Sequence, residues 1–100
     1  MDITVKELKE KIASEEEFIL IDVREEHEHE EFNVGGKLIP LGDVMHAVDD
    51  LEEQMDEEIV VYCRSGNRSG MAQEILEQHG FSNVRNLEGG MMAWEEAFGK

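Results

Sequence analysis

The sequence predicts an α/β domain with a mostly parallel sheet flanked by helices. Two short segments, 18–23 and 59–62, are almost continuously apolar, as strands buried on both faces of a parallel sheet are. Stretches with apolar residues at helical spacing separate the expected strands, and this alternation is typical of parallel sheets. A chain of 100 residues has room for one such domain and hardly for two, so we expect a single domain over residues 1–100.

The first expected element is a helix near the N-terminus. Thr4 is a suitable N-cap, and Glu7 follows it three residues later, as in a capping box. Ile3 and Leu8 are spaced as the two residues of a hydrophobic staple. The apolar face of this helix consists of Val5, Leu8 and Ile12.

The strand at 18–23 leads into a polar stretch, 24–36, which ends in two glycines and is expected to be a loop. A short strand at 37–39 follows, and Pro40, the only proline, ends it. Asp43 is then the expected N-cap of a further helix. The apolar positions of that helix are Val44, Val48, Leu51 and Met55.

The second half repeats the alternation. The strand at 59–62 precedes a polar loop and a helix that Gly80 closes. A last strand at 84–87 and a short helix after residues 89–90 complete the chain. The longer helix has Ala72, Ile75, Leu76 and His79 on one face. The last helix carries a hydrophobic cap made of Met91, Met92, Trp94 and Phe98.

Charge and hydropathy narrow the function classes. The chain has 25 acidic and 9 basic residues and a net charge of −16. This charge disfavours binding to nucleic acids or anionic membranes, because both require a basic surface. No apolar run approaches the roughly 20 residues that span a bilayer. The N-terminal residues lack the basic start and apolar block of a signal peptide, so we expect a cytoplasmic protein.

The single cysteine, Cys63, follows the strand at 59–62. It cannot form an internal disulfide and excludes metal sites that need several thiolates, so it is either an inert buried residue or a reactive centre. The loop that follows favours the reactive centre. Gly66 permits a tight turn that points successive N–H groups inward, and the next helix, about six residues on, adds the positive end of its dipole. Arg64 and Arg68 add two charges, so we predict a cysteine that is largely thiolate at neutral pH.

Four segments resemble the motifs of the rhodanese family, and they occur in the family's order. Together they cover most of the chain. The chain departs from the family at residues 33–38, where the family often has Gly-His-Ile-Pro-Gly-Ala. The four motifs read Asp22-Val23-Arg24-Glu25, Ile39-Pro40-Leu41, Cys63-Arg64-Ser65-Gly66-Asn67-Arg68-Ser69 and Leu87-Glu88-Gly89-Gly90-Met91-Met92-Ala93-Trp94.

The resemblance implies a rhodanese-like three-layer fold with a five-stranded sheet, and a sulfurtransferase. In the implied reaction, the Cys63 thiolate takes a sulfane sulfur from thiosulfate or another persulfide donor and passes it to cyanide or a thiol acceptor. Arg64 would hold the anionic oxygens of the donor, and Arg68 would supply charge or brace the loop. Ser69 would cap the next helix and offer its hydroxyl to the sulfur. The residues expected to bind substrate and surround the persulfide are Arg64, Ser65, Gly66, Asn67, Arg68 and Ser69.

Other functions stay open at this point. A non-catalytic binding or regulatory module is one, although such relatives usually lack the cysteine. Phosphatases and arsenate reductases with the same scaffold have a similar loop that is one residue longer between its cysteine and its arginine. Here only four residues separate Cys63 from Arg68. The strongly acidic surface repels a small anionic donor and suits a basic protein partner. A basic protein is therefore an alternative sulfur acceptor.

Charged residues outside the loop are interpreted as structural. His27 and His29 lie in the acidic segment 25–31 but share a face only in an extended segment, so a solvated surface is favoured there and no metal or cofactor is expected. Asp22 ends its strand at the same sheet edge as the cysteine, and Arg24 is expected to pair with a nearby carboxylate.

Overall fold

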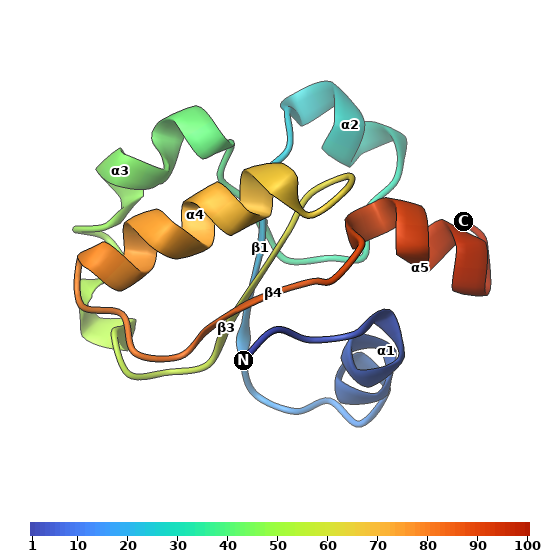
Figure 1. The fold of residues 1–100 in the computed structure, drawn as a ribbon, viewed down its shortest axis with the longest axis horizontal. Helices are drawn as coiled ribbons and strands as arrows, with labels where there is room; N and C mark the ends of the chain where they lie inside the picture. Colours follow the sequence, from blue (N-terminus) through green and yellow to red (C-terminus); the bar gives the residue numbers. More distant parts are fainter.

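Four parallel strands form the centre of the computed structural model, which describes all residues 1–100 (Figure 1). The strand order is β2-β1-β3-β4, and the register pairs Asp22 with Tyr62 and Val61 with Asn86. The carboxyl ends of three neighbouring strands therefore meet at one edge of the sheet. The predicted α/β fold with a parallel sheet is confirmed. The strands are β1 (Ile19–Asp22), β2 (Lys37–Leu38), β3 (Ile59–Tyr62) and β4 (Val84–Asn86).

The sheet has four strands where the family resemblance implied five. The nearest equivalent of a fifth is a one-residue parallel bridge between Ile3 and Leu87. The Ile3 amide donates to the Asn86 carbonyl at 3.0 Å, and the Glu88 amide donates to the Ile3 carbonyl at 2.9 Å. Pairing stops there because Thr4 already caps the first helix, which leaves too short a segment for a strand.

Helices cover both faces of the sheet (Figure 1). Along β3 the side chains alternate: Ile59 and Val61 belong to one buried cluster with the helices α3 and α4, whereas Val60 and Tyr62 belong to another with α1 and α5. This alternation explains why the strand is apolar throughout. The five helices are α1 (Val5–Ala13), α2 (Glu26–Glu31), α3 (Val44–Ala47), α4 (Asn67–Gln78) and α5 (Gly90–Phe98).

Helix α1 begins as predicted, but its buried face differs. The Thr4 hydroxyl accepts the Glu7 amide at 3.2 Å, which confirms the N-cap. Leu8 is fully buried, whereas Ile12 is 38% exposed and Lys11 takes an inward position. The Lys11 ammonium is satisfied there by Glu58, at 2.8 Å. A buried ion pair thus replaces the end of the expected apolar face.

The segment 24–55 departs most from the prediction. Helix α2 lies where a loop was expected, and Glu25 and Glu28 form a capping box at its start. The helix expected over Val44 to Met55 is only α3, flanked by 3-10 helices at Leu41–Asp43 and Glu52–Gln54. Asp43 makes no capping hydrogen bond there.

The last two helices agree with the sequence in outline. Helix α4 begins at Asn67, earlier than expected, and Gly80 follows its end with a φ of +94°. In α5, Met91 and Trp94 are buried as predicted. Met92 and Phe98 are 52% and 38% exposed, so the predicted hydrophobic cap is only half formed.

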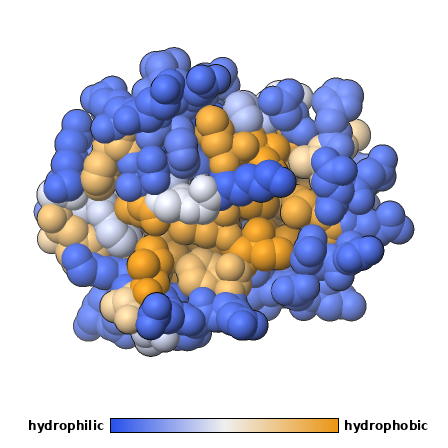
Figure 2. Space-filling model, turned by 180° about the vertical axis from the view of Figure 1, so that it is seen from behind, coloured by the Kyte–Doolittle hydropathy of each residue, from blue (hydrophilic) through white to orange (hydrophobic).

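The surface combines a charged rim with exposed apolar areas. Figure 2 shows one face on which hydrophobic residues gather in the middle and hydrophilic residues surround them. None of the helices has the length and apolar character needed to cross a membrane. The largest apolar groove, of about 470 Å³, is lined by Lys9, Ile12, Ala13, Phe32, Asn33, Val34 and Trp94.

Candidate active site

Cys63 follows β3 directly and lies at the carboxyl edge of the sheet, with its side chain fully buried. Its Sγ accepts hydrogen bonds from the Gly66 amide at 3.1 Å and the Ser69 amide at 3.4 Å. The Ser69 hydroxyl oxygen lies 3.3 Å from the same sulfur. The loop therefore directs the positive ends of several dipoles at the sulfur, which is the arrangement that stabilises an anion.

Gly66 gives this loop its shape. It occupies the N-cap of α4 with a φ of +101°, a conformation that other residues rarely adopt. Its carbonyl accepts the first helical hydrogen bond, from the Gly70 amide at 3.0 Å, and a second from the Asn86 side chain, also at 3.0 Å. The chain can thus turn from strand to helix within a few residues while its amides face Cys63.

The start of α5 holds the other side of the loop. The amides of Met91 and Met92 donate to the carbonyls of Cys63 and Arg64, both at 2.9 Å. A Cβ on Gly90 would lie 2.5 Å from the Cys63 carbonyl oxygen and 2.6 Å from that of Arg64. Gly90 of the C-terminal motif therefore permits a close contact between α5 and the loop.

The surroundings of Cys63 favour its charged form. Burial by itself raises the pKa of the thiol, because it penalises the thiolate. The hydrogen bonds from Ser69, Gly66 and the amide of Ser65 outweigh this effect, so the pKa of Cys63 lies below its ordinary value. This direction agrees with the predicted thiolate, and the main cause is hydrogen bonding by the loop.

The residues predicted to surround the persulfide differ in their exposure and in their contacts. The prediction that Ser69 caps α4 is wrong. Gly66 holds the N-cap position, and Ser69 lies inside the first turn of the helix. Its hydroxyl does approach the sulfur, as was also predicted. Ser69 is buried, Gly66 and Arg68 are half-buried, and the exposed residues are Arg64, Ser65 and Asn67.

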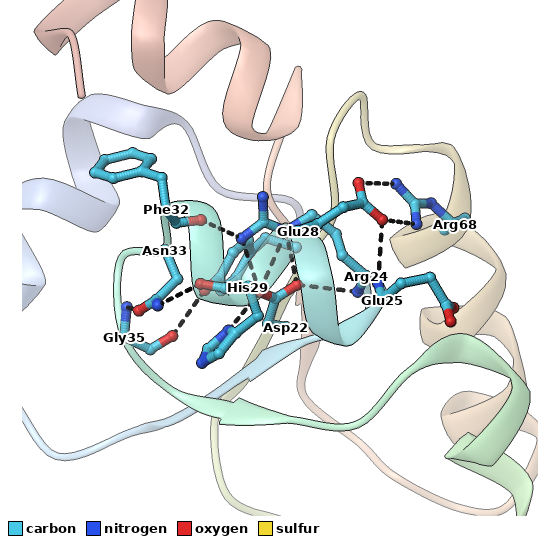
Figure 3. A network of polar contacts seen from close by, with 10 residues as sticks. Asp22, Arg24, Glu25, Glu28, His29, Phe32, Asn33, Gly35 and Arg68 are labelled. Carbon is cyan, nitrogen blue, oxygen red and sulfur yellow. Dashed lines mark hydrogen bonds and ion pairs between the residues drawn. The ribbon is translucent and has the colours of Figure 1, made fainter.

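Arg68 binds Glu28 of α2 (Figure 3). Two parallel hydrogen bonds join the guanidinium to the carboxylate, at 2.8 and 2.9 Å. The hydrogen bonds from Arg68 lower the pKa of Glu28 to about 2, against the opposing effect of partial burial. Arg68 therefore braces the loop against α2. Arg64 makes no ion pair and lines a polar hollow of about 60 Å³ beside Glu28, Glu31 and Glu95.

A second polar network joins the end of β1 to α2 (Figure 3). Asp22 is fully buried and accepts hydrogen bonds from the Arg24 amide and guanidinium at 2.9 to 3.2 Å. The His29 Nδ1 lies 2.8 Å from the same carboxylate, and Arg24 also donates to the Phe32 carbonyl at 2.7 Å. Burial opposes ionisation of Asp22, yet the hydrogen bonds from Arg24 and His29 lower its pKa. The predicted pairing of Arg24 is thus confirmed, with Asp22 as partner.

The sequence reasoning missed two residues of this site. Glu28 lies in the acidic segment 25–31, whose composition indicates a solvated surface, and Asn86 lies within an expected strand. The signal for Asn86 was its position: a polar residue ends β4, beside the strand that carries Cys63. Its side chain contacts both the Gly66 carbonyl and the Ser69 hydroxyl.

Comparison with known proteins agrees with this geometry. The family model described as "Rhodanese-like domain" matches residues 4–97. The chain belongs to the rhodanese-like domain family. Its loop, sheet and C-terminal motif are therefore those of a rhodanese-like domain, as the sequence resemblance indicated.

Relatives of this rhodanese-like domain are named for sulfur transfer. The candidate sulfurtransferase YtwF of Bacillus subtilis (strain 168) is 44% identical over 95 residues, which cover 94% of this chain and 89% of YtwF. A sulfurtransferase of Allochromatium vinosum is 32% identical over 94 residues, covering 93% of this chain and 86% of that protein. The crystal structure of a rhodanese-related protein from Thermoplasma volcanium has a TM-score of 0.81 and 32% identity, covering 97% of this chain and 92% of that one. Sulfur transfer is the class of activity that these likenesses support.

Proposed function

We propose that this rhodanese-like domain is a sulfurtransferase that carries a sulfane sulfur as a persulfide on Cys63. The observation that carries the proposal is the convergence of the Gly66 and Ser69 donors on one buried sulfur. An inert core cysteine needs no such donors, whereas a thiolate or a persulfide anion does.

The reaction consists of two displacements at sulfur. In the first, the Cys63 thiolate attacks the outer sulfur of thiosulfate; the new S–S bond forms as the old one breaks, and sulfite leaves with the electron pair. In the second, cyanide or an acceptor thiolate attacks the terminal sulfur of the persulfide. Cys63 then leaves as a thiolate, and the sulfur departs as thiocyanate or as a new persulfide.

The groups of the loop that do not donate to Sγ have separate roles in the reaction. The amides of Asn67 and Arg68 open α4 and have no acceptor within the helix, so they are suited to the outer, charged sulfur. Arg64 is exposed and free of an ion pair, so it is suited to the anionic oxygens of the donor. Arg68 braces the loop through Glu28.

Mass measurement of the intact protein tests the proposal. After incubation with thiosulfate, the native protein should gain one sulfur atom, and Cys63→Ser should gain none. Addition of cyanide should release thiocyanate and restore the original mass. If neither thiosulfate nor a small persulfide adds sulfur to the native protein, the proposal is wrong and a binding module is favoured. Faster hydrolysis of a phosphate ester than sulfur transfer in the same preparation would instead indicate a phosphatase.

A further inference from the structure

The Ser69 hydroxyl lies between two acceptors. Its oxygen is 3.3 Å from the sulfur of Cys63 and 2.5 Å from Oδ1 of Asn86. A hydroxyl has one proton and can donate it to only one of these atoms at a time. Which of them receives it decides whether Ser69 stabilises a charge on the sulfur.

The orientation of the Asn86 amide is fixed by Gly66. The Gly66 carbonyl can only accept, and it lies 3.0 Å from Nδ2 of Asn86. The opposite orientation would place two carbonyl oxygens against each other. Oδ1 therefore faces Ser69, and two oxygens 2.5 Å apart need a proton between them.

We propose that Asn86 is a positioning residue that holds the Ser69 hydroxyl proton while Cys63 is a neutral thiol and releases it when the sulfur becomes charged. This inference rests on the proposed function, because it concerns the same sulfur. It adds a residue outside the loop to the groups that control that sulfur.

Two arrangements of protons follow. In the neutral form, the Cys63 thiol donates to the Ser69 oxygen, and Ser69 donates to Asn86. In the charged form, the thiol proton has left to solvent, and the Ser69 O–H bond rotates toward the sulfur without breaking. A hydrogen bond to an anion is stronger than one to a neutral amide, so the rotation is favourable once the sulfur is charged. Asn86 thus stabilises the neutral form by about one hydrogen bond.

Loss of the Asn86 side chain should therefore make Cys63 easier to ionise. The Gly66 carbonyl keeps its hydrogen bond from the Gly70 amide, so the loop stays in place. The charged groups around the sulfur stay as well: Arg64, and Arg68 with its partner Glu28 from α2. On the β4 side, the carboxylate of Asp2 accepts the backbone amide of residue 86, which every variant retains. The main change is that the Ser69 proton becomes free to face the sulfur.

The rate of alkylation by iodoacetamide as a function of pH measures the pKa of Cys63 and tests the proposal. In Asn86→Leu, which keeps the branched shape of the side chain, the pKa should fall by about 0.5 to 1 unit, the equivalent of one neutral hydrogen bond. In the Ser69→Ala background the same substitution should produce no fall, because no hydroxyl proton remains to be released. Ser69→Ala alone should raise the pKa. Asn83→Leu, an exposed asparagine at the other end of β4, is the matched control and should leave it unchanged.

Each result decides the question. A pKa that is unchanged or higher in Asn86→Leu overturns the proposal, and so does an equal fall with and without Ser69. Asn86→Ala carries the same expectations and serves if the leucine variant does not fold. Alkylation does not depend on sulfur transfer, so this test succeeds or fails separately from the proposed function.

Discussion

Glu28 and Arg68 are 40 residues apart in the chain and meet through two parallel hydrogen bonds beside the active-site loop. The pair joins α2 to the start of α4. It also neutralises one of the two arginines of the loop, so Arg64 is the only loop cation without an ion pair. The charge available to an anionic donor is therefore smaller than the loop sequence alone indicates.

Glu28→Gln should improve the use of thiosulfate. The amide can still accept from the Glu25 backbone, but it no longer neutralises Arg68, so a second positive charge faces the donor. We expect the KM for thiosulfate to fall about threefold to tenfold, since one freed charge contributes on the order of 1 kcal/mol at a partly exposed site. Steady-state thiocyanate formation measures this change. Glu95→Gln is the matched control, because Glu95 lines the same hollow and makes no ion pair, so its substitution removes one charge and frees no cation. Equal effects of both variants would contradict the prediction.

The same pair should stabilise the fold only while Glu28 is ionised. Its pKa is about 2 in the folded protein, against an ordinary value of 4.5. A lowered pKa means that the stabilisation is complete above about pH 4.5 and is lost as the pH falls through about 2. The two side chains are 21% and 33% exposed, so we expect a contribution on the order of 1 kcal/mol. Urea unfolding of the native protein and Glu28→Gln should differ by this amount at pH 7 and by much less near pH 2. The same difference at both pH values would contradict the prediction.

The features predicted correctly are those that local sequence determines. The strands β1 and β3 are apolar throughout because both of their faces are covered, and a run of that kind is visible without any tertiary information. The turn at Gly66 requires a positive φ, and the position of Cys63 after a buried strand places it at the edge where sites form. Fold class and nucleophile could therefore be predicted together.

The features missed are those that depend on which elements become neighbours. Helix α2 has no apolar face, and none of its residues is buried. Its polar contacts reach Asp22, seven residues before His29, and Arg68, 40 residues after Glu28. Contacts of this kind leave no hydrophobic periodicity in the sequence that would predict the helix. Asn86 is likewise part of the site only because β4 pairs with β3. Hydrophobic patterns reveal burial, but they do not reveal polar pairing across the sheet edge.

Gly90→Ala should destabilise the protein strongly. The added Cβ would meet the Cys63 and Arg64 carbonyl oxygens at 2.5 and 2.6 Å, so α5 would have to move away from the loop. We expect the free energy of unfolding to fall by about 3 kcal/mol, from steric overlap added to the cost of a positive φ. Gly35→Ala is the matched control, because Gly35 also has a positive φ but no atom within 4 Å of the added Cβ. It should lose only about 1 kcal/mol. Urea unfolding measures both values, and equal losses would show that the contact with the loop is not tight.

The kcat/KM for thiosulfate should rise when salt is added at low ionic strength. A dianion approaching a chain of net charge −16 is repelled over the whole surface, and this repulsion is screened beyond roughly 8 to 10 Å at cellular salt. Attraction to Arg64 acts only at contact, within a hollow that also holds Glu28 and Glu31, so screening removes more repulsion than attraction. We therefore expect kcat/KM for thiosulfate to increase severalfold between about 10 and 150 mM salt, while kcat changes little. Alkylation of Cys63 by iodoacetamide, an uncharged reagent, serves as the control and should be nearly independent of salt. A flat or falling kcat/KM for thiosulfate would mean that the local charge of Arg64, and not the net charge, controls the approach of the donor.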